Sequence, residues 1–122
     1  MHKLVTVHCS PREFREMFED AGIHCFSKDA LAELYYYLEK REDELGYTYI
    51  IKPVALSKQW AEYESFEQYI ALTKASYASL EELSRHCDII MVDDEGFLMS
   101  MRRVFGVVEP IPFDETDYWS TD

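Results

Sequence analysis

Three histidine–cysteine dipeptides are the segments of this sequence whose residue types could most directly do chemistry: His8–Cys9, His24–Cys25 and His86–Cys87. Imidazole and thiolate are zinc ligands, so a composite metal site would form if these segments met in space. Adjacent residues of a strand point to opposite faces, which makes a His–Cys dipeptide poorly suited to give one metal two ligands. The sequence also has no CxxC or HxxxH spacing. We therefore expect packed cysteines beside boundary histidines, and no bound metal.

A cysteine–histidine nucleophile is a second chemistry that these dipeptides could support, but it meets the same geometric objection. It would also need an oxyanion-binding feature such as a glycine-rich turn, and the chain contains four glycines in all. No Walker loop, GxGxxG, GxSxG or HExxH motif occurs. We expect no catalytic residues, no cofactor and no enzymatic activity.

Carboxylates cluster in the sequence VDDEG at residues 92–96, where they could hold a divalent cation. The D-x-D-x-D-G ladder of a calcium loop is missing. Asp-Asp-Glu-Gly is typical of a hairpin turn, so we expect a turn here, with Gly96 at a positive φ.

Hydrophobic periodicity and capping signals predict the elements that position these residues. Four helices are expected to begin after the N-cap residues Ser10, Ser27, Ser65 and Ser79, and the second helix should run over residues 28–45. Strands are expected at residues 3–8 and 47–56, followed by a hairpin of residues 88–92 and 97–101 that residues 104–108 extend.

This order, β-α-α-β-α-α-β-β, predicts an α+β fold: a small, mostly antiparallel sheet packed by about four helices, with a C-terminal hairpin. We expect one domain over residues 1–108. Residues 109–122 hold five carboxylates and no basic residue, and are expected to form an acidic C-terminal tail.

Charge is the strongest global feature, with 24 acidic against 12 basic residues and a formal net charge of −12. Such a chain is repelled by phosphates and by anionic membranes and is attracted to basic surfaces. No segment resembles a signal peptide or a membrane span. We expect no direct contact with nucleic acid or membrane, and a cytoplasmic location.

The second helix contains three consecutive tyrosines, Tyr35, Tyr36 and Tyr37. At 100° per residue the leucines of this helix share one sector, Tyr35 lies at its border, and Tyr36 and Tyr37 fall on the acidic side. Tyrosine is enriched at protein interfaces, so we expect a partner-binding surface there. Residues 60–69 repeat the mixture of aromatic and acidic residues. The predicted partner-binding residues are Glu33, Tyr36, Tyr37, Asp43, Glu44, Glu62, Tyr63 and Glu64.

Residues 26–69 resemble small acidic α+β proteins of phages, prophages and other mobile elements, most of which have no assigned activity. The resemblance is carried by Phe26, Ser27, Ala30, Leu31, Gly46, Glu62, Tyr63, Ser65, Phe66 and Glu67. The segment EYESFE is also similar to a short motif in anti-restriction proteins of the ArdA type, which are acidic mimics of DNA.

Two hypotheses follow. In the first, the chain is a non-enzymatic phage or mobile-element inhibitor of a basic, nucleic-acid-handling host defence protein, such as a CRISPR effector or a restriction enzyme. In the second, it is a phage or prophage accessory domain or antitoxin-like partner that self-associates, as a homodimer for example, without mimicking nucleic acid. In the second case the charge serves only solubility.

Overall fold

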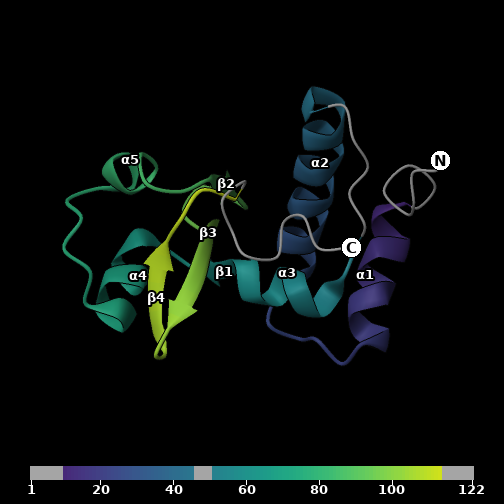
Figure 1. The fold of residues 1–122 in the computed structure, drawn as a ribbon, viewed down its shortest axis with the longest axis horizontal. Coiled ribbons are helices and arrows are strands. Elements are labelled where there is room, and N and C mark those ends of the chain that lie inside the picture. Colours follow the sequence, from purple (N-terminus) through teal and green to yellow (C-terminus); the bar gives the residue numbers. More distant parts are fainter. Residues whose placement is uncertain (1–9, 46–50, 114–122) are drawn as a thin grey trace.

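The structure is a computed structural model that describes residues 10–45 and 51–113. Five helices and four strands follow one another in the described residues (Figure 1): α1 (Pro11–Asp20), α2 (Lys28–Leu45), α3 (Pro53–Gln59), β1 (Trp60–Tyr63), α4 (Phe66–Thr73), α5 (Leu80–Leu83), β2 (Ile89–Met91), β3 (Phe97–Val104) and β4 (Val107–Pro110).

Strand β3 organises the sheet, because each of the other three strands pairs with it and every pairing is antiparallel. The first half of β3 lies between β1 and β2, and its second half pairs with β4. This arrangement confirms the predicted α+β class with a small antiparallel sheet and a C-terminal hairpin.

The sheet is buried on both faces. Helices α1, α2 and α3 gather on one side of the strands, and α4 and α5 lie on the other (Figure 1). Alternate residues of β3 follow this division, since Leu98 joins the cluster of α1 and α2, whereas Phe97 and Met99 join the cluster of α4 and α5. Burial on both faces explains why β3 begins with a nearly continuous apolar run and lacks an alternating pattern.

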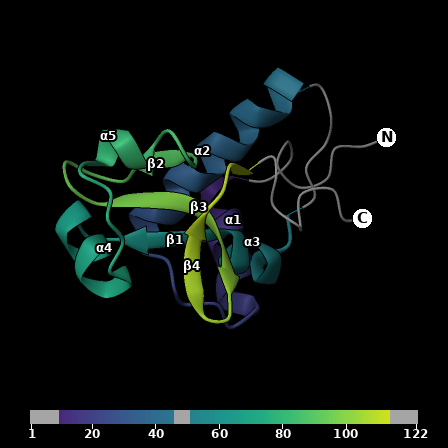
Figure 2. The same ribbon diagram turned by 60° about the vertical axis from the view of Figure 1, so that its left-hand side comes forward.

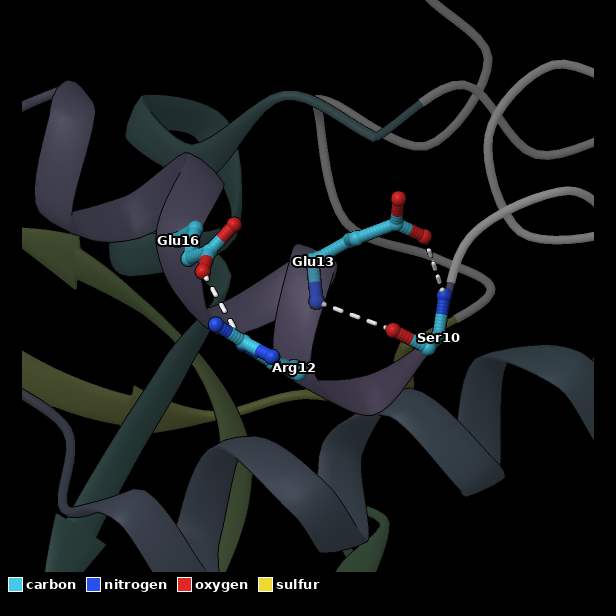
Figure 3. Close-up of polar contacts among 4 residues, drawn as sticks. All are labelled: Ser10, Arg12, Glu13 and Glu16. Atoms are coloured by element: carbon cyan, nitrogen blue, oxygen red, sulfur yellow. Dashed lines mark hydrogen bonds and ion pairs between the residues drawn. The ribbon is translucent and has the colours of Figure 1, made fainter.

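The predicted N-caps are confirmed. At α1, the Ser10 hydroxyl accepts a hydrogen bond from the Glu13 amide at 3.2 Å, and the Glu13 carboxylate accepts one from the Ser10 amide at 2.8 Å (Figure 3). This reciprocal capping box satisfies amides that an uncapped helix would leave open. The side chains of Ser65 and Ser79 also accept hydrogen bonds from the amides of Gln68 and Glu82 at the starts of α4 and α5.

The strand predicted at residues 47–56 is wrong from Pro53 onward, where α3 begins. Proline suits the first helical position because its fixed φ is already helical and no amide donor is needed there. The chain becomes extended again at Trp60, and β1 lies in a segment that the sequence pattern left irregular. Residues 46–50, and the strand predicted at 3–8, lie outside the described residues.

The C-terminal hairpins also differ from the prediction. Gly96 does not have a positive φ, whereas Phe105 and Gly106 do, at 53° and 81°. Strand β3 does continue past residue 101, to Val104, but residues 105–108 do not extend it further, because a turn at Phe105 and Gly106 reverses the chain into β4. Strand β4 runs past residue 108, where the tail was expected to begin, and Phe113 is fully buried.

Asp88 connects helix α2, the sheet and the C-terminal segment through hydrogen bonds. Its carboxylate accepts hydrogen bonds from the Tyr37 hydroxyl at 3.0 Å and from the Phe113 amide at 2.9 Å. Its own amide donates to the hydroxyl of Ser100, which donates in turn to the carbonyl of Ile111. Helix α2 and the C-terminal segment therefore meet at the Asp88 carboxylate, and strand β3 is joined to the Asp88 amide.

We predict that Tyr37→Phe lowers the free energy of unfolding by about 1–2 kcal/mol, because it removes a donor from a partly buried carboxylate. Tyr36→Phe is the matched control. The Tyr36 side chain is 53% exposed, so this change should cost less than about 0.5 kcal/mol. Urea unfolding followed by circular dichroism measures both, and equal stability of the two variants would contradict the role of Asp88.

Candidate functional site

The exposed side of α2 is the main acidic surface that the predicted residues form. We call it the α2 acidic face. It lies opposite the buried leucines of this helix, which pack on α1 and the sheet. Lys40 interrupts it, and Glu44 forms a 3.5 Å ion pair with Arg41 at its border. The face consists of Asp29, Glu33, Tyr36, Lys40, Asp43 and Glu44, all of them exposed.

The three tyrosines of α2 have three different environments. Tyr35 is buried, with its ring 5.6 Å from that of Phe14. Tyr36 is the exposed one. The expectation that Tyr37 is largely exposed is wrong, because its ring is half-buried, lies 5.2 Å from that of Trp60, and its hydroxyl bonds to Asp88. The helical angle placed Tyr37 near the acidic side, but the long-range partner that covers its ring left no local signal.

The aromatic residues of the segment 60–69 do not form a second exposed aromatic surface. Tyr63 is 8% exposed and packs against Tyr69 and Phe97, with ring centroids 5.1 and 5.8 Å away. Burial raises the pKa of its phenol. Trp60 and Tyr69 are buried as well, Trp60 in the cluster of α1 and α2 and Tyr69 in the cluster of α4 and α5.

Glu62 has a structural contact that the sequence did not reveal. Its two carboxylate oxygens accept hydrogen bonds from the amide of Ser27 at 2.8 Å and from the hydroxyl of Ser27 at 2.7 Å. The same hydroxyl accepts from the Ala30 amide at the start of α2. Glu62 therefore joins β1 to the capped end of α2, and both of its oxygens are engaged there.

The structure thus keeps five of the eight predicted partner-binding residues exposed. Four of them, Glu33, Tyr36, Asp43 and Glu44, belong to the α2 acidic face. The fifth, Glu64, is separate and lines a hollow of about 450 Å³ together with Asp93, Asp94 and Glu95. In the sequence, Glu64 and residues 93–95 are far apart. The pairing of β1 with β3 brings them together in this acidic hollow, since Tyr63 lies opposite Phe97.

Asp93 shapes the turn that borders the acidic hollow. Its carboxylate accepts hydrogen bonds from the amides of Glu95 and Gly96, and these bonds hold its pKa below the usual value of 3.8. Gly96 is needed here for space, because an added Cβ would lie 3.1 Å from the Asp93 carboxylate. The segment 92–96 is therefore a turn, as predicted.

We predict that Asp93→Asn destabilises the fold at neutral pH and that the difference from wild type closes under acid. The carboxylate is held more strongly in the folded state, so its contribution is present above pH 3.8 and is lost as the pH falls through the lowered folded value. Urea unfolding across a pH series measures this. A difference that does not depend on pH would contradict the charge-assisted turn.

A second hollow, of about 570 Å³, is lined in part by the histidine–cysteine dipeptide at residues 24–25. His24 and Cys25 come from the loop before α2, and Arg103 comes from the β3–β4 hairpin. Burial raises the pKa of the Cys25 thiol above its usual 9.0, in spite of the charge of Arg103. A nucleophilic cysteine needs the opposite shift.

The two residues of the dipeptide at 86–87 have different environments. Cys87 is buried, its thiol donates to the carbonyl of Leu83 at 3.6 Å, and burial raises its pKa to about 12. His86 is exposed, with its ring 5.2 Å from that of Tyr77. Within residues 10–45 and 51–113, no three His, Cys, Asp or Glu side chains form a group that could hold a metal ion. His8 and Cys9 lie outside these residues.

We predict slow alkylation of Cys25 at neutral pH, with a rate that rises with pH and has its midpoint above that of a free cysteine thiol. Cys87 should react only when the chain unfolds. Iodoacetamide labelling followed by peptide mass spectrometry resolves the cysteines individually. Fast labelling of Cys25 at neutral pH, indicating a lowered pKa, would reopen the possibility of a nucleophile.

No known protein family, curated protein or solved structure matches this chain. The resemblance to phage and anti-restriction proteins therefore stays a prediction. Among the described helices, none is long and apolar enough to cross a membrane.

Proposed function

We propose that this chain is a non-enzymatic anti-defence protein of a phage or mobile element, which binds and inhibits a basic, nucleic-acid-handling host protein. The candidates are a CRISPR effector or a restriction enzyme. The observation that carries the proposal is the α2 acidic face, where an exposed tyrosine lies among four carboxylates and one lysine on a helix whose other side is fixed in the core.

The net charge of −12 supports a basic partner. Carboxylates concentrated on one face raise the rate of encounter with a positive surface and repel phosphates. The acidic hollow at Glu64 adds to this field. Surface repulsion within the chain opposes folding, so the excess of carboxylates is a cost that binding to a cationic partner would offset.

Tyr36 adds an apolar contact surface, which the charged side chains around it do not provide. An exposed tyrosine offers a large apolar ring and a polar hydroxyl, and loses little conformational freedom when it is covered. Such residues often contribute most of the binding free energy at the centre of an interface, while surrounding charges set the association rate. Glu33 lies about one turn before Tyr36 on α2 and Asp43 about two turns after it, which places Tyr36 near the middle of the acidic face.

The proposal is tested first in cells. The chain is expressed in a panel of bacterial strains that each carry one restriction or CRISPR system, and the plating efficiency of an unmodified phage is measured. We expect plating to be restored in at least one strain. Failure to protect the phage in any strain would contradict inhibition of these systems.

The location of the binding surface is tested with two charge-matched variants. Glu33→Lys/Asp43→Lys should abolish inhibition, whereas Glu19→Lys/Asp20→Lys, which changes the net charge equally at the exposed end of α1, should retain most of it. With the purified effector, the association rate should fall about tenfold or more between about 50 and about 300 mM NaCl. Equal loss in both variants would mean that net charge alone acts, and would contradict the α2 acidic face.

A further inference from the structure

The turn of the β3–β4 hairpin carries the most exposed hydrophobic side chain of the described residues, Phe105. Val104 pairs with Val107, so Phe105 and Gly106 form the turn between them, and both have a positive φ. Asn, Asp or Gly are the residues that suit this type of turn. A bulky aromatic residue at a positive φ is uncommon and costs stability, so Phe105 is poorly explained by the fold alone.

An apolar groove of about 550 Å³ lies beside this turn. Val104 and Val107, which flank the turn, line the groove together with Tyr77 and Pro110. Both valines are themselves exposed. A protruding phenyl ring and an apolar groove wide enough to hold one therefore lie next to each other on the same surface. Such a surface is self-complementary under a two-fold axis.

The charge of the hairpin is unlike that of the rest of the chain. Residues 97–110 contain Arg102 and Arg103 and a single carboxylate, Glu109. Arg102 forms a 3.0 Å ion pair with Glu109 of β4, across the hairpin. Two copies of a chain with a net charge of −12 repel each other over most of their surfaces. The repulsion is weakest when the two copies approach each other with their β3–β4 hairpins in contact.

We propose that the β3–β4 hairpin is a dimer interface, in which a second copy of this chain covers Val104 and Val107 and each copy places Phe105 in the groove of the other. In the part of the chain the structure describes, β4 pairs only with β3, so its other edge has no strand partner. Figures 1 and 2 both show the hairpin turn at the opposite end of the molecule from the C-terminal end of α2. This interface leaves the C-terminal end of the α2 acidic face uncovered.

The test is sedimentation equilibrium of the full chain over about 1 to about 500 µM. We expect a monomer–dimer equilibrium that strengthens several-fold as NaCl rises from about 50 to about 500 mM, because salt screens the repulsion between copies. Phe105→Asn should weaken the dimer by about 100-fold or more. Asparagine suits the turn, so this variant should fold at least as well as the wild type, which circular dichroism and urea unfolding check.

Tyr36→Gln is the matched control, because it removes an exposed aromatic ring from α2 and should leave the dimer intact. A wild type that is monomeric at every concentration would overturn the proposal, and the partner of the hairpin would then be a different protein. A dimer that persists in Phe105→Asn, or that is lost in Tyr36→Gln, would also overturn it. Phe105→Asn should still inhibit in the plating assay, so the failure of the dimer and the failure of the anti-defence function can be told apart.

Discussion

The fold depends on the carboxylate of Asp88, because it is the point where segments distant in the sequence are joined by hydrogen bonds. The rings of Tyr37, Trp60 and Phe113 pack around this point, with centroids 5.2 to 6.0 Å apart. Hydrogen bonds to a charged group are stronger than neutral ones, and they strengthen further where nearby rings exclude water. The same packing fixes the rotation of α2 about its axis, and with it the direction in which the acidic face points.

The carboxylates of this chain divide into those that hold the fold together and those that face the solvent. Asp88, Glu62 and Asp93 each accept two hydrogen bonds from the chain, and Glu13 closes a capping box. Glu42 is buried, although it lies in the charged run REDE at residues 41–44. The exposed carboxylates are what remains after these structural roles, and they lie on α1, on α2 and in the hollow at Glu64, among other places.

The sequence predicted best what is encoded locally. Serine caps, the amphipathic period of α2 and the turn at Asp93 depend on residues within a few positions of each other, and all are confirmed. The environment of Tyr37 depends on Asp88 and Phe113, far along the chain, and Glu62 bonds to a serine that precedes it by 35 residues. The acidic hollow likewise requires the register of β1 and β3. No pattern within a single segment contains such information.

Two features of this molecule reduce stability without an evident benefit to folding: the surplus of exposed carboxylates and the aromatic residue at a positive φ in the β3–β4 turn. Residues that are unfavourable for folding in this way tend to lie at functional sites. The two features also respond to salt in opposite ways, since screening weakens attraction to a basic partner and relieves repulsion between identical acidic chains. One chain can therefore use both, with its hairpin joining two copies while the acidic end of α2 in each copy stays free for a cationic partner.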